Sequence, residues 1–347
     1  MTVPPERDTG ADRYLVTGAL GCIGAWTVRA LVRAGAHVTA FDLGRDPRRL
    51  RLIMRDDELD AVELVEGDIT DLAVLTETLE ARGITNVIHL AALQVPFCRA
   101  DPPRGALVNV LGTMNVFEAV KRAARHRPMA PVVYTSSIGM FSLEDADPVT
   151  GTLHVDAPAH PVNHYGVFKQ ANEANARVYW LEDAIPSIGI RPLTVYGVGR
   201  DQGMTSGPTK AIVAAVLGRP YTVPFRGPTM YQYAPDVAAT LIAASHRGLD
   251  GARVFNLPGV VADGPALASA IETALPGGSR WIDFEPVELP FPSDVDHDGI
   301  DVLGPLPATS FVDGVRESVT IYRGLLERGR LDPAQQGLDP TPSSLPS

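Results

Sequence analysis

Tyr165 and Lys169 are the residues whose types and spacing most directly indicate catalysis. They stand four apart in a segment with helical periodicity, so both side chains lie on one face of the predicted helix. A phenol has a pKa near 10 and is a poor base at neutral pH, but a neighbouring ammonium group favours the phenolate. With nine tyrosines and three lysines, this spacing would arise by chance roughly 0.08 times. The pair predicts a tyrosine base; the alternative is a surface Tyr–Lys stacking pair.

Hydroxyl residues end a short apolar run upstream of this helix. Residues 132–135 have the character of a strand, and Ser136 and Ser137 follow it directly. Small-molecule sites assemble at the carboxyl edge of a parallel sheet, where a hydroxyl can hydrogen-bond a substrate oxygen that loses its proton. Serine is also a common turn former, so this signal has weight only beside Tyr165 and Lys169.

A glycine-rich loop near the N-terminus predicts phosphate binding. Thr17, Gly18, Gly21 and Gly24 form a T-G-x-x-G-x-x-G pattern between a strand-like run and a helical pattern. Small residues here allow a tight turn, let the backbone approach a pyrophosphate and leave helix N–H groups free to bind it. The bare pattern would arise by chance roughly 0.3 times, so its specificity comes from the flanking strand and helix. The alternative is a set of ordinary turn and packing glycines.

Asp42 closes the second strand-like run, 18 residues after Gly24. A carboxylate at this position can bind both hydroxyls of an adenosine ribose and repels a 2′-phosphate, so we expect NAD rather than NADP. Arg45, Arg48 and Arg49 follow it. They could bind a 2′-phosphate, and the simpler interpretation is that they are solvated surface residues.

Short aliphatic runs alternate with longer helical patterns, which is typical of βαβ units and a parallel sheet. The predicted strands are residues 13–17, 37–41, 62–65, 86–90, 132–135 and 185–190, with helices at 24–34, 72–81, 104–125 and 162–183 and a charged surface helix within 45–60. We therefore expect an α/β fold: a doubly wound parallel Rossmann sheet over residues 11–192 that carries the catalytic residues. A smaller α/β substrate-binding lobe follows over 193–330, of which 232–257 could return to the Rossmann lobe, and 331–347 is a predicted disordered tail.

The charge and the cysteine content of the chain argue against several classes of binding partner: nucleic acids, anionic membranes and metal ions. Thirty basic against 41 acidic residues give a net charge of −11, which repels nucleic acid and anionic membrane surfaces. Cys22 and Cys98 form no disulfide framework and no metal-ligand spacing, so we expect no metal site and a reducing, cytoplasmic location. No apolar stretch has the length of a membrane helix.

Together these residues resemble the extended short-chain dehydrogenase/reductase superfamily, in its NAD-dependent epimerase/dehydratase group, from about Arg13 to at least Ala239. Gly67-Asp68-Ile69 resembles the adenine-contacting segment, and His89-Leu90-Ala91-Ala92 the motif of the fourth strand. The cofactor contacts that this resemblance implies are Gly18, Gly21, Cys22, Ile23, Gly24, Asp42, Asp68, Ile69, Leu90, Ala91, Ala92, Asn109, Thr135, Tyr165, Lys169, Pro192 and Thr194.

The resemblance also implies a mechanism. Ser137, Tyr165 and Lys169 would be the catalytic residues: Tyr165 takes the hydroxyl proton as hydride passes to the nicotinamide, Ser137 orients the oxygen, and Lys169 holds the cofactor ribose and tunes Tyr165. In such proteins the helices that correspond to 104–125 and 162–183 form a four-helix dimer interface, so a homodimer is expected.

Departures from the family pattern concern the substrate. Ser137 is followed by Ile138 and Gly139, whereas family dehydratases and decarboxylases carry acids there, so both reactions are disfavoured. Family epimerases of nucleotide sugars place an arginine where this chain has Thr229 and Met230. Arg226 lies slightly upstream and could compensate, but we expect no nucleotide diphosphate.

Substrate contacts are predicted at Gln94, Ser137, Ile138, Arg191, Thr205 and Arg226. The segment 199–210 is rich in hydroxyl, amide and glycine groups, which suits a small carbohydrate-like ligand and equally suits a flexible connector. Two functions remain open. The first is a dehydrogenase that oxidises a secondary hydroxyl of a sugar, sugar acid or polyol. The second is an epimerase that retains its NAD, with a nucleotide sugar among its candidate substrates. A third, a catalytically silent NAD sensor or scaffold, gives no reason for the Tyr165–Lys169 pair.

Overall fold

The computed structural model describes residues 12–338, and its centre is a seven-stranded sheet in which every neighbouring pair of strands is parallel. The strands, in spatial order, are β11 (Ala252–Asn256), β7 (Ser187–Arg191), β5 (Val132–Thr135), β4 (Asn86–His89), β1 (Arg13–Thr17), β2 (His37–Asp42) and β3 (Val62–Glu66). The chain runs outward from β1 to β3 and then crosses back to β4, so a crevice opens at the carboxyl ends of β1 and β4. The predicted doubly wound α/β fold is confirmed.

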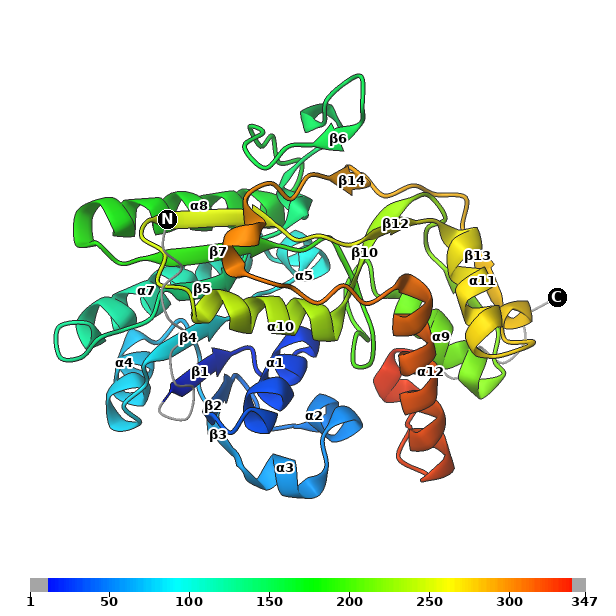
Figure 1. Cartoon of the computed structure of the whole chain (residues 1–347), viewed down its shortest axis with the longest axis horizontal. Helices are drawn as coiled ribbons and strands as arrows, with labels where there is room; N and C mark the ends of the chain where they lie inside the picture. Colours follow the sequence, from blue (N-terminus) through cyan, green and yellow to red (C-terminus); the bar gives the residue numbers. More distant parts are fainter. Residues whose placement is uncertain (1–11, 339–347) are drawn as a thin grey trace.

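Helices cover both faces of this sheet, because successive strand side chains point to opposite sides. In β1, Tyr14 and Val16 join the apolar cluster of α1 (Cys22–Arg33) and α10 (Ala234–Ser245). Leu15 joins the other cluster, under α4 (Leu72–Ala81), α7 (Gly112–Ala123) and α8 (His164–Asp183). All three strand side chains are fully buried. Figure 1 shows α1 and α10 packed together beside the strands.

The smaller lobe is built from short strands and three helices. Its elements are the three-stranded sheet β12 (Val260–Ala262), β10 (Thr229–Tyr233) and β8 (Thr194–Tyr196), the pair β9 (Tyr221–Val223) and β13 (Ile282–Phe284), and helices α9 (Gly207–Leu217), α11 (Gly264–Ala274) and α12 (Phe311–Glu327). A further pair, β6 (Thr152–Leu153) with β14 (Asp294–Val295), joins it to an excursion from the larger lobe.

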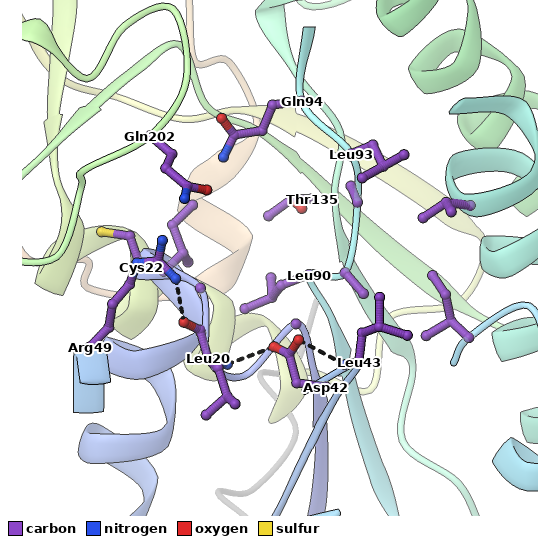
Figure 2. Close-up of a pocket in the computed structure, with 18 of the residues that line it drawn as sticks. Leu20, Cys22, Asp42, Leu43, Arg49, Leu90, Leu93, Gln94, Thr135 and Gln202 are labelled. Atoms are coloured by element: carbon purple, nitrogen blue, oxygen red, sulfur yellow. Dashed lines mark hydrogen bonds between the residues drawn. The ribbon is translucent and has the colours of Figure 1, made fainter. Parts of the chain in front are cut away.

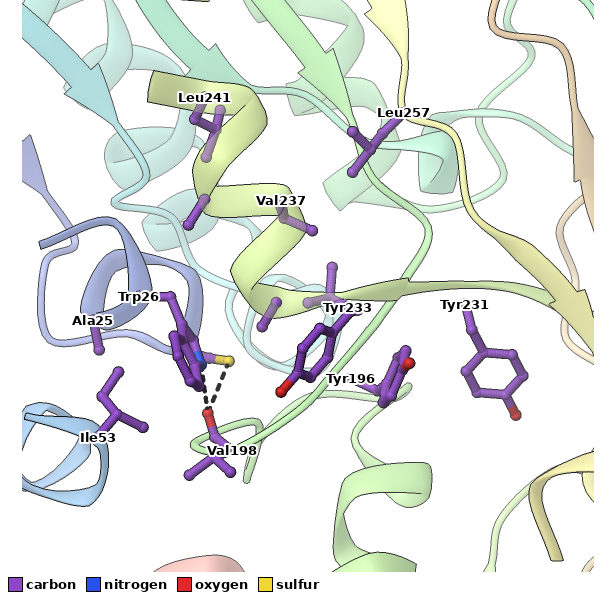
Figure 3. Packing of buried hydrophobic residues seen from close by; sticks show 14 of the residues in the cluster. Ala25, Trp26, Ile53, Tyr196, Val198, Tyr231, Tyr233, Val237, Leu241 and Leu257 are labelled. Atoms are coloured by element: carbon purple, nitrogen blue, oxygen red, sulfur yellow. Dashed lines mark hydrogen bonds between the residues drawn. The ribbon is translucent and has the colours of Figure 1, made fainter. Parts of the chain in front are cut away.

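The two lobes share one core. As the sequence allowed for residues 232–257, α10 packs against α1 and β11 extends the main sheet beside β7. Tyr196 and Tyr231 of the small sheet pack edge to face, and Tyr233 reaches Trp26 of α1 with ring centroids 6.4 Å apart (Figure 3). The Rossmann lobe is therefore completed by segments that lie beyond residue 192.

Two predicted helices differ in detail from those observed. The helix predicted at 104–125 is present as one continuous helical run over 102–123, made of α6 (Pro102–Ala106), a π-helical turn (Leu107–Leu111) and α7. The turn contains Asn109, whose side chain bonds the backbone of Leu93. The charged segment 45–60 forms two short helices, α2 (Arg48–Ile53) and α3 (Asp56–Asp60), because Met54 and Arg55 between them are extended.

The end of the chain also differs from its prediction. Residues 331–338, predicted as part of a disordered tail, pack with Leu331, Gln336 and Leu338 buried, and the Tyr322 hydroxyl donates to Gln336 Oε1 (3.5 Å). Residues 339–347 lie outside the described residues. Between residues 12 and 338 no helix is long and apolar enough to cross a membrane, and no three His, Cys, Asp or Glu side chains are grouped to hold a metal ion.

A buried hydrogen-bond chain fixes the middle of the sheet to the helices above it. His89 lies between Thr17 (Oγ1 to Nδ1, 2.7 Å) and Thr113 (Nε2 to Oγ1, 3.0 Å). Because the Thr113 hydroxyl donates to the Asn109 carbonyl (2.7 Å), it accepts from His89 Nε2–H, and Nδ1 accepts from Thr17. Burial lowers the pKa of His89 to about 3, so the imidazole stays neutral in the folded state.

We expect this histidine to make stability fall on acidification. Its pKa is lower in the folded state than the usual 6.5, so below pH 6.5 the unfolded chain binds a proton that the folded chain excludes. The contribution is present above pH 6.5 and decreases towards pH 3, by about 2 kcal/mol at pH 5. Urea unfolding at pH 7 and pH 5 should therefore show a drop that is about 2 kcal/mol smaller in His89→Gln. The same change at exposed His126 should leave the drop unaltered, and equal drops in all three proteins would contradict the assignment.

Candidate active site

A cavity of about 500 Å³ lies in the crevice over the carboxyl ends of β1, β2, β4 and β5. Figure 2 shows Asp42 and Leu43 at one end of it and Gln94 and Gln202 at the other. The predicted site residues that line it are Gly18, Gly21, Cys22, Ile23, Gly24, Asp42, Asp68, Ile69, Leu90, Ala91, Ala92, Gln94, Thr135, Ser137, Tyr165, Lys169 and Pro192. The crevice therefore brings the glycine loop, the strand-end acid and the Tyr–Lys pair to one space.

Close backbone packing explains the glycines of the loop. Gly18 has φ +67°, and a Cβ there would lie 2.6 Å from the Ala91 nitrogen. A Cβ on Gly24 would lie 2.2 Å from the Gly18 carbonyl oxygen, so α1 could not start where it does. Gly21 precedes α1 without a side-chain cap, which leaves the first N–H groups of the helix facing the cavity.

Asp42 is held by backbone N–H groups at the end of β2. Leu20 N donates to Oδ2 and Leu43 N to Oδ1, both at 2.8 Å. Burial raises the pKa of Asp42, while these two bonds and the charge of Arg49 act in the opposite direction. Each carboxylate oxygen keeps capacity for a further donor. Asp42 is thus a rigid acceptor that lines the cavity.

The three arginines after Asp42 lie near acidic side chains; Arg48 and Arg49 line the cavity, where Arg48 approaches Asp201 Oδ2 at 3.8 Å. Arg49 donates from Nη1 to the Leu20 carbonyl (2.9 Å) and from Nε and Nη2 to Asp201 Oδ1 (3.0 and 2.8 Å). Arg45 pairs with Glu66 at the surface (2.7 Å). Arg49 therefore links helix α2 to the segment after β8 across the cavity rim, a contact that sequence reasoning missed.

The Tyr165–Lys169 pair stands at the start of α8. Asn163 caps this helix by accepting from Gly166 N (2.9 Å), and Lys169 lies one turn in, with Nζ donating to the Thr135 carbonyl (2.7 Å). The Nζ atom is 5.6 Å from the centroid of the Tyr165 ring. Burial lowers the pKa of Lys169 to about 8. The two side chains therefore share one buried face, as their spacing predicts.

Ser137 is in position to act on the same phenol. Burial raises the pKa of Tyr165, and a hydrogen bond with Ser137 and the charge of Arg200 counteract the rise. Ser137 Oγ accepts from Gly139 N (2.9 Å), so the hydroxyl hydrogen is free to donate. A Cβ on Gly166 would lie 2.9 Å from the Gly139 oxygen, so a glycine is needed where α8 approaches this turn.

Two predicted cofactor residues lie outside the cavity. Asn109 is buried and bonds the backbone of Leu93 through Oδ1 (2.7 Å) and Nδ2 (2.9 Å), so it holds the loop after β4. Thr194 is fully buried, and its hydroxyl pairs with that of Thr229 (2.8 Å) in the small sheet. Both side chains have structural partners instead of facing the cavity.

Four predicted substrate residues are also elsewhere. Ile138 is fully buried in an apolar cluster, and Arg191 is buried against Glu173. Thr205 is buried outside the cavity lining, and Arg226 is exposed and likewise outside it. Of the predicted substrate set, Gln94 and Ser137 line the cavity.

Arg200 is a cavity residue that was not singled out. Its Nε is buried without a hydrogen-bond partner, and Nη2 reaches only Thr205 Oγ1 at 3.4 Å. No carboxylate of residues 12–338 forms an ion pair with it at 4.0 Å or less. The Gln94 Oε1 atom is also buried and without a partner. The only sequence signal for Arg200 was its place in the polar segment 199–210.

Comparisons with known proteins agree with this site. Residues 14–257 match the model of the NAD dependent epimerase/dehydratase family. The UDP-glucose 4-epimerase of Mycolicibacterium smegmatis is 31% identical over 323 residues, which cover 90% of this chain and 98% of that protein. The UDP-glucuronate 4-epimerase 3 of Arabidopsis thaliana is 33% identical over 187 residues, which cover 53% of this chain and only 42% of that protein.

A solved structure extends the likeness to the whole fold. The L-threonine dehydrogenase of Cupriavidus necator in its holo form superposes with a TM-score of 0.75 over 90% of this chain and 99% of that one, at 22% identity. That likeness concerns the fold. The family model covers most of the chain, and together with the glycine loop, Asp42 and the Tyr165–Lys169 pair in one cavity it shows that the protein is an enzyme of the NAD-dependent epimerase/dehydratase family, within the extended short-chain dehydrogenases/reductases.

Proposed function

We propose that this enzyme binds NAD and oxidises a secondary hydroxyl of a small polar substrate, such as a sugar, sugar acid or polyol, with Tyr165 as the base. The observation that carries the proposal is one cavity with Asp42 and the glycine loop at one end and the buried Tyr165–Lys169 pair at the other. The net charge of −11 and the buried free cysteines support a cytoplasmic enzyme without nucleic-acid or membrane partners.

The residues present fit a dinucleotide. The uncapped start of α1 leaves backbone N–H groups for a pyrophosphate, and Gly18 and Gly24 allow the close backbone packing that forms this turn. Asp42 would accept from both ribose hydroxyls, and Arg49 is engaged by Asp201 rather than open to a 2′-phosphate, which favours NAD over NADP. When bound there, NAD supplies the hydride acceptor for the oxidation.

The chain's own residues handle the proton. Tyr165 in its phenolate form takes the substrate hydroxyl proton, Ser137 donates a hydrogen bond to the reacting oxygen, and the ammonium of Lys169 favours the phenolate. Ser137 is followed by Ile138 and Gly139, neither of which can act as the extra acid or base that a dehydration needs. The site therefore has one base and no additional acid or base beside Ser137, which suits the oxidation of an alcohol.

Unsatisfied polar groups support a substrate rich in oxygen atoms. The Arg200 guanidinium and the Gln94 amide line the cavity, and each has a buried polar atom without a partner. A ligand that bonds such an atom relieves a penalty on the order of 1–3 kcal/mol per atom. Vicinal hydroxyls would satisfy both atoms, because one oxygen can accept from Arg200 Nε–H while the neighbouring hydroxyl donates to Gln94 Oε1. A carboxylate would pair with Arg200 and leave Gln94 Oε1 without a donor.

The second candidate is an epimerase that retains its NAD, and two observations favour it. The match to a UDP-glucose 4-epimerase extends over 98% of that protein. The bond of Asp201, 6% exposed, to Arg49 closes the segment after β8 over the cavity rim, and Gly199 N donates to the Tyr322 hydroxyl (3.2 Å). Against a nucleotide diphosphate, Thr229 is bonded to Thr194 and Arg226 lies outside the cavity.

Turnover tests the proposed base. Tyr165→Phe should bind NAD like the wild type and lose at least about 100-fold in turnover, because general-base catalysis typically contributes that much or more. The assay follows NADH at about 340 nm with sugars, sugar acids and polyols, with NADP as a parallel arm. Steady NADH production supports the dehydrogenase, whereas tightly held NAD without net NADH and with inversion of a sugar carbon supports the epimerase. An undiminished rate in Tyr165→Phe would refute the assigned base.

Cofactor release tests the closed rim. Asp201→Asn should raise the rate of NADH dissociation by at least about tenfold, because it removes the carboxylate charge that Arg49 grips while keeping the shape. Stopped-flow NADH fluorescence measures the rate. Arg45→Met, which breaks only the exposed pair with Glu66, is the matched control and should release NADH at the wild-type rate. Equal rates in Asp201→Asn and the control would mean that the rim does not retain the cofactor.

The apolar surface of two helices supports a homodimer through 104–125 and 162–183. Leu107, Leu111, Val178 and Leu181 expose 41–63% of their surface on these segments. Leu181→Glu should shift the wild-type dimer to a monomer in analytical ultracentrifugation, because a charge would be buried at the interface. Leu326→Glu, at an equally apolar but unrelated exposed position on α12, should leave the dimer intact. A monomeric wild type would contradict the expectation.

A further inference from the structure

A buried ion pair lies directly behind the catalytic side chains. Arg191, at the end of β7, donates from Nε to Glu173 Oε1 (2.7 Å) and from Nη2 to Oε2 (2.6 Å). The side chains are only 7% and 12% exposed. Burial of two charges costs desolvation that a close pair barely repays, so the pair contributes little to stability relative to apolar residues of the same size. The role of the Arg191–Glu173 pair therefore lies in the segments that it holds together.

The pair joins five segments of the chain. Ser136 Oγ, after β5, donates to Glu173 Oε1 (2.5 Å), and Arg191 Nη1 donates to the Val155 carbonyl (2.7 Å) and to Asn256 Oδ1 (3.3 Å). Glu173 therefore ties helix α8 to the ends of β5, β7 and β11 and to the excursion that contains β6.

The hydrogen bond between Ser136 and Glu173 lies next to the proposed catalytic residues at both of its residues. Glu173 lies one helical turn after Lys169, and Ser136 stands between Thr135, whose carbonyl accepts from Lys169 Nζ, and Ser137. A shift of Glu173 would therefore move Lys169 along α8 and Ser137 along the strand end together. The charge of the same carboxylate also acts on the ammonium of Lys169, one helical turn away.

We propose that Glu173 is a positioning residue for the proton transfer at Tyr165, which holds Ser136 and α8 in register and keeps Lys169 protonated in its buried site. The proposal rests on the proposed function. Its substance is that a negative charge, and not only a hydrogen-bond acceptor, is needed at this position.

The groups around Lys169 show why the charge matters. Tyr165 on α8, Cys98 on α5 (Val95–Ala100), His89 on β4 and Glu173 face it, and the imidazole of His89 is neutral. Burial lowers the pKa of Lys169 to about 8, and the charges of Cys98 and then Glu173 act in the opposite direction. Because burial raises the pKa of the Cys98 thiol, Glu173 is the one of these two groups that is charged near neutral pH. So close to neutral pH, a small further fall would deprotonate Lys169 under working conditions.

The scarcity of lysine makes a direct test feasible. Because the chain has only three lysines, ¹³C labelling at Cε gives three NMR signals, and Lys169→Arg identifies the one that belongs to Lys169. Glu173→Gln, which keeps an acceptor for Ser136, should lower the titration midpoint of Lys169 by at least about half a pH unit, a roughly threefold loss of proton affinity. Glu182→Gln, at an exposed acid on the same helix, should leave the midpoint unchanged.

A second variant keeps the test valid if Glu173→Gln fails to fold. Glu173→Gln leaves Arg191 buried without its partner, so Glu173→Gln combined with Arg191→Met removes both charges and should show the same direction of shift. An unchanged midpoint in either folded variant overturns the proposal. If neither variant folds, the pair is structural and the proposal is also overturned.

Turnover separates this proposal from the proposed function. With a substrate in hand, the alkaline limb of the pH–rate profile of Glu173→Gln should move to lower pH, because Lys169 loses its proton earlier and ceases to favour the phenolate. A wild type without turnover on any alcohol refutes the proposed function while the Lys169 titration still tests Glu173. Normal turnover with an unshifted profile in Glu173→Gln refutes the positioning role alone.

Discussion

The hydrogen bond from Lys169 Nζ to the Thr135 carbonyl is the contact on which the arrangement of the site depends. It fixes helix α8 to the end of β5 at the point where Tyr165 and Ser137 must face one another. The bond also compensates for burying an ammonium group, which otherwise loses its hydration. The charge of Glu173, one helical turn further along α8, also favours the protonated form of Lys169.

Polar interactions at the sheet edge support this contact from below. Asn172, one position before Glu173, donates to the Asn109 carbonyl (2.9 Å) and to the Thr113 hydroxyl (3.2 Å), which is bonded to His89. These bonds run from β4 through the π-helical turn to α8. Helix α8, which carries Tyr165 and Lys169, is therefore held to the sheet by buried hydrogen bonds as well as by its apolar contacts.

The features that could be predicted from the sequence are those that depend on residues close together in the chain. The glycine loop was predictable because each glycine is required by a short-range backbone approach, and the Tyr165–Lys169 pair because helical periodicity alone puts the two side chains on one face. The sheet followed from alternating apolar runs. Of the candidate cofactor residues, Asn109 lies in the π-helical turn and Thr194 at the start of β8, and the direction of their side chains was not readable from the sequence.

What could not be predicted depends on partners far apart in the chain. Arg49 and Asp201 are 152 residues apart, and neither stands in a local pattern that indicates the other. Arg191 was expected among the substrate contacts, and only the tertiary structure shows that it pairs with Glu173. Thr205 and Arg226 lie on irregular segments, where no periodicity indicates which way a side chain points.

The edge strand β11 has a consequence for how the chain comes to be folded. It pairs with β7 through residues 252–256, after the chain has passed through most of the second lobe. During synthesis, the first 191 residues therefore present an unpaired edge at β7 until about 65 more have been added, an interval in which strands of other molecules can bind there. Long-range pairing of this kind also slows folding. The part of the chain that follows the first lobe thus also protects the edge of its sheet.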